Sequence, residues 1–374
     1  MKKAFVYGVA VEGENFTDRV AETKRLIRDF ENGQNVVLIS PRRMGKTSLV
    51  RRVISQVDTN KVAVVHLDIY DCRTEYDFYN KLATAILKQT SGKGELMLHN
   101  IKEFLTRLTP KVSFGVDPAN EMSVSLGIAP EDYSPEEILQ LPEKIALKMG
   151  KHIVVCIDEF QQIGTFPDSL SVQKRVRGVW QLQQEVSYCL YGSKKHMLTD
   201  LFQNKRMPFY QFGDIRFLTP IALDDWRPFI RSKFEENGQT ISDEQIARIC
   251  ETVEYQSSYV QQLAWNVMLC SDSVVSDDAM DEAIDDLIDQ NSTLFLQQTE
   301  GLSSYQINFL KALAAGESGD FTSAAILKKY NLGTKSNISR IVESLIKKEL
   351  IEKVGRKVTI ADPVFRLWTL RETL

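Results

Sequence analysis

The 374-residue sequence lacks the features of membrane and secreted proteins. No stretch approaches the roughly 20 consecutive apolar residues that a membrane-spanning helix needs, and the first residues, MKKAFVYGVAVEGENF, turn polar too soon for a signal peptide. The four histidines are dispersed, and the five cysteines have no paired spacing: Cys72, Cys156, Cys189, Cys250 and Cys270. Neither a disulfide framework nor a zinc site is therefore predicted. These absences favour a cytoplasmic protein with reduced thiols and no membrane partner.

Charge is distributed unevenly along the chain, although the net charge of the whole is only −4. Residues 221–302 carry a net charge of −13, whereas residues 303–374 carry +5 and the first 220 residues +4. A chain of this length is expected to form two or three domains. The changes in charge predict a core over 1–220, an acidic segment over 221–302 and a basic module over 303–374. A basic module raises nucleic acid as a partner.

Short apolar runs alternate with helical patterns through the first 220 residues. Buried parallel strands are expected for the runs at 36–39, 62–69, 153–157, 189–191 and, less cleanly, 217–221. Apolar residues recur at helical spacing before the first run, at 19–31, and between most of the runs, at 75–89, 135–149 and 171–186. The alternation predicts an α/β domain with a parallel sheet. The segment 111–128 alternates on both sides of a Pro/Asn turn, and predicts a β-hairpin inserted in this domain.

The rest of the chain shows a helical pattern that ends in a hairpin. Residues 224–291 are typical of an acidic helical bundle. Three further helices are expected at 304–315, 322–330 and 335–348, and two alternating strands follow around Gly355 and Arg356. Three helices and a basic hairpin are typical of a winged helix-turn-helix domain.

A Gly-Lys-Thr sequence follows the first apolar run, within NVVLISPRRMGKTSLV at 35–50. A phosphate-binding loop has the pattern G-x-x-x-x-G-K-[ST], and Ser40 occupies the position of its first glycine, which mainly needs a small residue. Gly45 would permit the turn, Lys46 would bridge the β- and γ-phosphates, and the hydroxyl of Thr47 would hold Mg²⁺. The expected strand and helix on either side supply the context that this motif requires. The alternative is a chance Gly-Lys-Thr at the start of a helix.

A second motif is the acidic pair at the end of the run HIVVCIDEFQQ, 152–162. In phosphate-loop ATPases an aspartate at such a strand end orients Mg²⁺ and a following glutamate activates water, which are the roles expected here for Asp158 and Glu159. Ser193, at the end of the next strand, is a candidate sensor of the γ-phosphate, although a Gly-Ser strand end is unspecific. The alternative for Glu159 is simple solvation of the strand end. Both motifs together indicate a nucleotide site at which hydrolysis is chemically possible.

The motifs occur in an order that resembles the archaeal-type ATPases of the STAND group, relatives of the AAA+ and origin-recognition ATPases. They are SPRRMGKTS, CIDEFQ, LYGS, LTPI and ADPVFRLW, and the resemblance extends from about Phe16 to Trp368. It implies an α/β P-loop NTPase core with a parallel sheet, an all-α lid at 221–302 and a winged helix-turn-helix domain at 303–374. It also implies ATP or ADP with Mg²⁺ as cofactors, and ATP as the substrate.

The same resemblance assigns residues that spacing does not. In NFTDRVAE, Phe16, Arg19 and Glu22 match the segment that packs against adenine, although Asp18 replaces the usual glycine. Pro220 matches a proline thought to face the nucleotide. The implied nucleotide-binding residues are Phe16, Arg19, Ser40, Pro41, Arg42, Arg43, Met44, Gly45, Lys46, Thr47, Ser48 and Pro220. The implied catalytic residues are Lys46, Asp158, Glu159 and Ser193, and the implied metal ligands are Thr47 and Asp158.

One position departs from the family. An arginine often stands where this chain has Phe212. If that arginine acts on the γ-phosphate, Arg206 or Arg216 would replace it here, or turnover would be slow. The alternative is that both arginines are solvated surface charges. An arginine finger contributes about 10³–10⁵ in rate where it operates, so its loss would be easy to measure.

Polar and basic residues on the expected recognition helix and wing are candidates for DNA contact: Lys335, Asn337, Arg340, Lys353, Arg356 and Lys357. Docking to a protein is the alternative, since a charge of +5 is moderate. Two functions stay open. One is a Mg²⁺-dependent ATPase whose nucleotide state repositions the winged helix; the other is a nucleotide-gated adaptor that binds ATP or ADP and hardly hydrolyses it. The sequence leaves oligomerisation open.

Overall fold

The computed structural model describes residues 4–90, 114–115, 125–126, 134–317, 320–355 and 357–372. The chain forms two compact units. The α/β unit is Arg19–Thr219, and the helical unit combines Met1–Asp18 with Pro220–Leu374. The division at 219/220 lies where the sequence predicts the end of the core, whereas the first 18 residues group with the helical unit. The predicted boundary between lid and winged helix, at 302/303, stays a prediction.

A five-stranded parallel sheet forms the centre of the α/β unit, in the order β2-β5-β6-β1-β7. Its strands are β1 (Val36–Ile39), β2 (Val62–Asp68), β5 (His152–Asp158), β6 (Val186–Gly192) and β7 (Asp214–Phe217). Strands β1 and β6 are wholly buried, and β5 is buried except at its first residue. Burial on both faces explains their continuous apolar runs. The predicted parallel sheet is confirmed.

The last strand begins earlier than its apolar run. The run at 217–221 is not the strand; β7 spans Asp214–Phe217 and pairs with β1 at the edge of the sheet. Its residues are partly or fully exposed, so it carries no continuous apolar signal. Pro220 lies beyond the strand, as expected for a residue that cannot donate to the ladder. The helix expected at 171–186 is also shorter, because α7 (Ser169–Trp180) ends before β6 begins.

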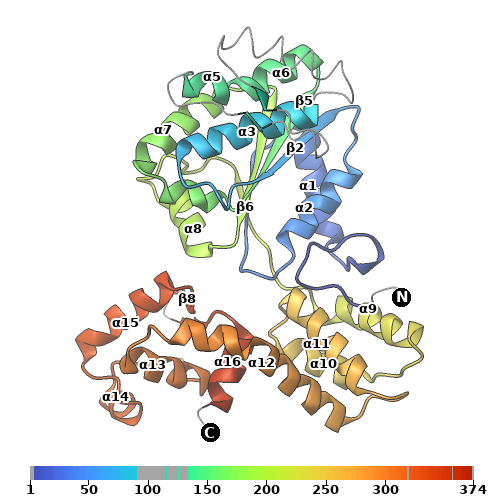
Figure 1. Cartoon of the computed structure of the whole chain (residues 1–374), viewed down its shortest axis with the longest axis vertical. Helices are drawn as coiled ribbons and strands as arrows, with labels where there is room; N and C mark the ends of the chain where they lie inside the picture. Colours follow the sequence, from blue (N-terminus) through green and yellow to red (C-terminus); the bar gives the residue numbers. More distant parts are fainter. Residues whose placement is uncertain are drawn as a thin grey trace. The chain divides into compact units, whose positions relative to one another are not determined.

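Helices cover both faces of the sheet (Figure 1). Helices α1 (Val20–Glu31) and α2 (Lys46–Gln56) lie on one face. The other face packs against α7 and against three more helices: α3 (Glu75–Thr90), α5 (Pro135–Leu139) and α6 (Leu141–Met149). Helix α8 (Lys195–Gln203) follows β6. Because side chains alternate along a strand, Val37 and Ile39 of β1 belong to the core on this second face.

The predicted hairpin insertion lies mostly outside the described residues. Two short strands of that segment are described, β3 (Phe114–Gly115) and β4 (Ser125–Leu126). They pair antiparallel, with Phe114 opposite Leu126 and Gly115 opposite Ser125.

The helical unit begins with the short 3-10 helix η1 (Gly13–Asn15) and resumes after Pro220. Its helices in the predicted lid are α9 (Leu223–Glu236), α10 (Asp243–Thr252), α11 (Ser257–Cys270) and α12 (Asp277–Thr299). The winged helix then comprises α13 (Ser304–Ala314), α14 (Ala324–Lys329), α15 (Lys335–Lys347), β8 (Ile351–Val354), β9 (Lys357–Ile360) and α16 (Pro363–Arg371). The three helices after 303 and the hairpin are as predicted, whereas α12 continues beyond 291 and α16 was not predicted.

One hydrophobic core runs through the whole helical unit, from α9 to α16. Phe295, in α12, contacts Phe365 and Trp368 of α16, with ring centroids 5.3 Å and 5.8 Å apart. The Tyr259 hydroxyl, on α11, donates a 2.8 Å hydrogen bond to Asp362. The lid helices and the winged helix are therefore packed together rather than joined by a free linker.

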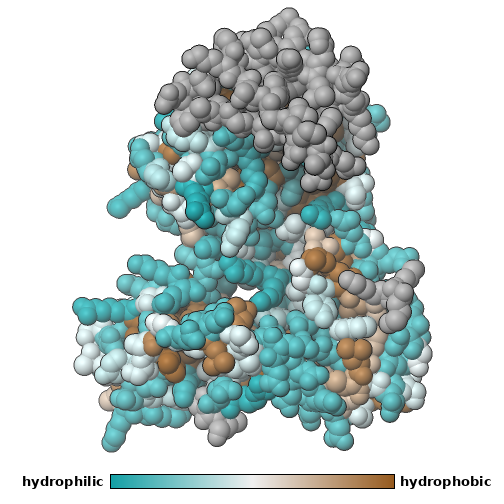
Figure 2. All heavy atoms as spheres, in the orientation of Figure 1, coloured by the Kyte–Doolittle hydropathy of each residue, from teal (hydrophilic) through white to brown (hydrophobic). Residues whose placement is uncertain are grey.

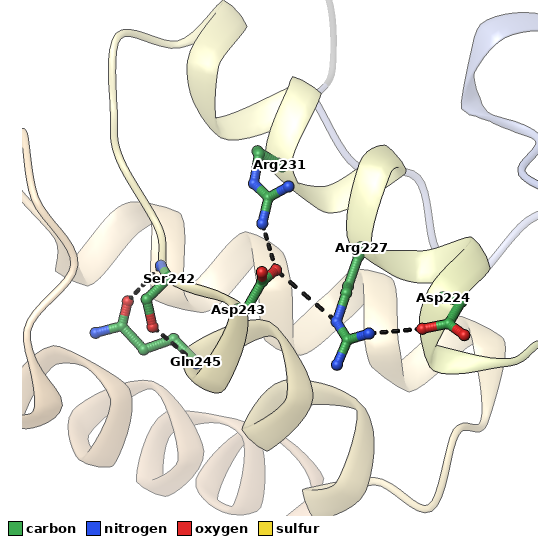
Figure 3. A network of polar contacts seen from close by, with 6 residues as sticks. All are labelled: Asp224, Arg227, Arg231, Ser242, Asp243 and Gln245. Atoms are coloured by element: carbon green, nitrogen blue, oxygen red, sulfur yellow. Dashed lines mark hydrogen bonds and ion pairs between the residues drawn. The ribbon is translucent and has the colours of Figure 1, made fainter.

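Charged side chains also join α9 to the start of α10 (Figure 3). Arg227 forms an ion pair with Asp224 at 2.5 Å and lies 3.8 Å from Asp243, which Arg231 also contacts. Ser242 caps α10 by accepting a hydrogen bond from a backbone N–H of its first turn. Asp243 therefore pairs with two arginines. It lies in the first turn of α10, where a negative charge is favourable.

The visible surface is mainly hydrophilic, with scattered hydrophobic areas (Figure 2). Exposed apolar side chains include Val9, Leu182 and Leu269, and isolated residues of this kind are ordinary on folded proteins. Among the helices that the structure describes, none combines the length and the apolar character needed to cross a lipid bilayer.

Candidate nucleotide site

Residues Ser40 to Gly45 connect the buried strand β1 to helix α2. Ser40 is buried, and its side chain is small enough for the point where the chain leaves the sheet. Arg43 and Gly45 have positive φ angles of 65° and 83°, the left-handed conformation that glycine adopts most easily. Helix α2 begins at Lys46, with Gly45 as its N-cap. The unpaired N–H groups of a first helical turn and the helix dipole favour an anion at such a place.

Lys46 is buried at the start of α2 and turns back onto the loop. Its Nζ donates hydrogen bonds to the carbonyl oxygens of Ser40, at 3.1 Å, and Pro41, at 2.9 Å. Burial lowers the pKa of Lys46 to about 8, against the opposing attraction of Glu159 and Asp158. The nearby charge of Arg42 contributes a smaller part of this lowering of the pKa. A poorly solvated ammonium whose hydrogen bonds go to two carbonyl oxygens would gain from an anionic ligand.

Thr47 and Asp158 come from different strand–helix connections and meet at the same edge of the sheet. The Thr47 hydroxyl donates a 2.8 Å hydrogen bond to Oδ2 of Asp158, which ends β5. Burial raises the pKa of Asp158 to about 6, although the Thr47 hydrogen bond opposes the shift. The two residues lie 111 positions apart in sequence, so the tertiary fold alone brings them together.

The pair fits the ligand chemistry of Mg²⁺. A hydroxyl and a carboxylate oxygen lie side by side, and Mg²⁺ takes one or two protein oxygens of this kind together with water and phosphate. A buried carboxylate with a raised pKa is also stabilised by a nearby cation. Within the described ranges no cluster of three or more histidine, cysteine or acidic residues forms a metal site, which does not conflict with a site completed by a nucleotide.

Glu159 follows Asp158 in a left-handed conformation, with a φ angle of 54°. Its Oε2 accepts a 3.0 Å hydrogen bond from the Ser193 hydroxyl and a further one from the Gln161 amide. Ser193 lies just past β6, which pairs with β5, so the carboxyl ends of both strands meet at this edge. Sequence reasoning found Glu159 and Ser193 but missed Gln161, although Gln161 is part of the quoted motif CIDEFQ.

Arg19 reaches the phosphate loop from the N-terminal end of α1. It is buried, has a φ angle of 59°, and donates to the Met44 carbonyl at 3.3 Å and to the Thr219 carbonyl at 2.6 Å. It also pairs with Glu22 at 2.9 Å. Its guanidinium therefore binds the loop backbone at Met44, a contact that the sequence pattern did not reveal.

The remaining predicted nucleotide-binding residues divide between the two units. Arg42 is exposed and Arg43 partly exposed, while Ser48 is buried in the first turn of α2. Phe16 and Pro220 belong to the helical unit. Their contact with the base stays a prediction.

Phe212, which stands where the ATPases that the sequence resembles often have arginine, is part of the core. It is buried among aromatic rings that include Trp180 and Phe209, with centroids 6.2 Å and 5.3 Å away. The Arg177 guanidinium carbon lies 4.9 Å from the Phe212 ring centroid. An aromatic residue at 212 therefore stabilises the α/β unit from within.

The two arginines considered as replacements differ in their surroundings. Arg216, on β7, is held by ion pairs with Asp29 at 2.5 Å and Asp214 at 2.8 Å. Arg206 is exposed in the connection after α8. Arg216 is therefore committed to a structural role, whereas Arg206 faces solvent.

On the winged helix, four predicted DNA-contact residues are exposed: Lys335, Arg340, Lys353 and Lys357. Asn337 is half-buried, and its Nδ2 is 3.5 Å from the Leu332 carbonyl oxygen. Arg356 lies outside the described residues. Apolar residues of α15 such as Ile338 and Ile341 face the core, which leaves the basic residues on the outer side of the helix.

Comparison with known proteins supports the same architecture. A family model described as a probable winged helix domain matches residues 293–371. A Walker-type ATPase of Pyrococcus abyssi has a similar structure, with a TM-score of 0.67, 18% identity and coverage of 96% of this chain and 97% of that chain. The ORC2 protein of Aeropyrum pernix, in ADPNP-ADP complexes, gives a TM-score of 0.61, 13% identity and coverage of 96% of both chains.

A third similar structure is the ORC1 protein of Aeropyrum pernix in complex with DNA, with a TM-score of 0.50, 14% identity and coverage of 96% of this chain and 94% of that chain. No curated protein sequence matches the chain. At these identities the similarity is one of fold. The chain thus shares the fold of these solved structures: an α/β core with a parallel sheet, helical regions and a C-terminal winged helix domain.

Proposed function

We propose that the chain is a Mg²⁺-dependent ATPase of the STAND type, in which the bound nucleotide controls the position of the winged helix. The observation that carries this proposal is the 2.8 Å hydrogen bond between Thr47 and Asp158, beside the buried Lys46. A hydroxyl, a carboxylate and an ammonium from two sequence motifs converge on one helix N-terminus. That combination suits a nucleoside triphosphate with its metal ion.

Each residue has a role that its present contacts support. Lys46 would exchange the carbonyls of Ser40 and Pro41 for the β- and γ-phosphates. Thr47 and Asp158 would hold Mg²⁺, which supplies charge neutralisation at the phosphates. Glu159 would take a proton from the attacking water. Ser193, which donates to the other carboxylate oxygen of Glu159, would sense the presence of the γ-phosphate.

The helical unit would be the responding part. Its lid helices and winged helix share one core, so a displacement of the lid carries the winged helix with it. The exposed Lys335, Arg340 and Lys353 make duplex DNA the favoured partner. The structure of an ORC1 protein with DNA supports this choice only through its similar fold.

Steady-state phosphate release tests the proposal. With ATP and Mg²⁺, Glu159→Gln is expected to keep its affinity for ATP while kcat falls by about 10²–10⁴. Lys46→Ala is expected to lose binding and turnover together, because it removes the buried ammonium at the start of α2. Lys61→Ala, at a lysine whose side chain is 63% exposed, is the matched control and should behave as wild type. Equal rates in all four proteins would refute an ATPase.

The second candidate is an adaptor that binds ATP or ADP and hardly hydrolyses it. Two observations favour it: Phe212 is buried where an arginine is common, and Arg216 is tied to Asp29 and Asp214. Nucleotide retained through purification, without phosphate release, would support the adaptor. Phosphate release stimulated by DNA or by self-association would exclude it, and loss of that stimulation in Arg206→Ala would identify the missing cation.

A further inference from the structure

Gln161 is a buried polar residue to which the chemistry above gives no role. It lies in the 3-10 helix η2 (Phe160–Thr165), directly after the acidic pair, and is 1% exposed. Its Nε2 donates to Oε2 of Glu159, while its Oε1 is buried without a hydrogen-bond partner. A buried carbonyl oxygen without a partner destabilises a fold. Stability therefore does not explain why a glutamine stands here.

The neighbouring strand leaves space for this amide. Gly192 ends β6, and a Cβ at that position would overlap Oε1 of Gln161 and lie 3.0 Å from its Cδ. The same Cβ would be 3.3 Å from the Cα of Glu159. Gly192 does not have a positive φ angle, so its backbone does not require glycine. The missing side chain is what allows the Gln161 amide to reach Glu159.

Gln161 and Ser193 converge on one oxygen of the same carboxylate. Both donate to Oε2 of Glu159, one from η2 and one from the end of β6. Two donors from different elements fix the plane of the carboxylate. Among the described residues no donor is bonded to its other oxygen, Oε1, which a general base must present to water within hydrogen-bond reach.

We propose that Gln161 is a positioning residue for ATP hydrolysis: its amide, in the space left by Gly192, orients the Glu159 carboxylate so that Oε1 meets the attacking water. This role rests on the proposed ATPase function. It predicts that kcat, rather than nucleotide affinity, depends on a donor at position 161.

Gln161→Met tests this directly, because methionine has the same length and no donor. We expect kcat to fall about 10²-fold while KM stays within about threefold of wild type. The melting temperature should not fall, because the substitution removes a buried carbonyl without a partner. Gln161→Glu, which keeps the shape and replaces the donor by an acceptor, should lose at least as much kcat. Gly192→Ala should reproduce the loss by displacing the amide.

Two matched controls come from α7. Gln173 is also 1% exposed, with an Oε1 that has no partner, but it is not bonded to Glu159. Gly178 has open space where a Cβ would be placed. Gln173→Met and Gly178→Ala should therefore leave kcat unchanged.

The outcomes separate this role from the ATPase itself. If wild type hydrolyses ATP and Gln161→Met has the same kcat, the role of Gln161 is overturned but the proposed ATPase activity is not. Parallel losses of ATP affinity, melting temperature and kcat in both Gln161→Met and Gly192→Ala also overturn it, since they would indicate packing. A wild type that releases no phosphate overturns the ATPase, and the role of Gln161 with it.

Discussion

Replacing Lys46 by methionine should stabilise the nucleotide-free protein while abolishing its response to nucleotide. Burial lowers the pKa of Lys46 from 10.5 to about 8. At about 1.36 kcal/mol per pKa unit, keeping this ammonium charged at pH 7 destabilises the fold by about 3 kcal/mol. The hydrogen bonds to Ser40 and Pro41, which methionine loses, offset roughly 2 kcal/mol of this. The variant should therefore be about 1 kcal/mol more stable than wild type at pH 7.

The sign of the difference should change with pH. Between about pH 8 and 10.5 the unfolded chain holds a proton on Lys46 that the folded protein has released, so the unfolding free energy of wild type rises with pH. Lys46→Met lacks this gain. Wild type should thus become the more stable protein by pH 9.5, as urea denaturation followed by circular dichroism would show.

The unfolding free energies of both proteins should then be measured with nucleotide present. With ATP and Mg²⁺ at about 100 times the dissociation constant, wild type should gain about 2.7 kcal/mol and Lys46→Met nothing. Lys61→Met, at an exposed position, should follow wild type throughout. A Lys46→Met protein that is less stable than wild type at pH 7, with parallel pH curves, would refute the reasoning.

Three further predictions concern other parts of the chain. Burial raises the pKa of Asp158 to about 6, so between about pH 4 and 6 the folded protein holds a proton that the unfolded chain has released. As the pH rises through this range, wild type should lose up to about 3 kcal/mol of unfolding free energy relative to Asp158→Asn. Denaturation measurements in which the two proteins depend on pH in the same way would contradict this. Phe212→Arg should lower the unfolding free energy by about 3–5 kcal/mol, because Phe212 is buried among aromatic rings; a stable variant with faster phosphate release would show instead that an arginine is tolerated there. Arg340→Ala should weaken duplex DNA binding and reduce the slope of log affinity against log salt by about one, whereas unchanged binding would favour a protein partner.

The sequence predicts those parts of the site whose signal is local. Gly45, Lys46 and Thr47 are consecutive, and their chemistry depends on a strand–loop–helix connection that the flanking apolar patterns reveal. The strand that precedes Ser40 and the strand that ends at Asp158 are buried on both faces, so their apolar runs are unbroken. The parallel sheet and the winged helix are predicted for the same reason.

The parts that the sequence does not predict depend on contacts between distant segments. Strand β7 is at an edge and partly exposed, so no apolar run marks it. The contact of Gln161 with Glu159 requires a glycine at 192 on the neighbouring strand, and no periodicity relates these positions. Similarly, nothing in the chain around Arg216 indicates that Asp29 would engage it.

The guanidinium of Arg19 joins three places that are remote in sequence. The chain passes between its two units only at 18–19 and at 219–220, so Arg19 is itself the first residue of one junction, and it binds the carbonyl of Thr219 at the other. Its second nitrogen binds the carbonyl of Met44 in the phosphate loop. A shift of the Met44 carbonyl around an incoming phosphate would therefore act on Arg19 and, through its other nitrogen, on the Thr219 carbonyl. In an Arg19→Met protein the phosphate loop would lose this connection to both ends of the α/β unit, while the chain connections at 18–19 and 219–220 stay intact.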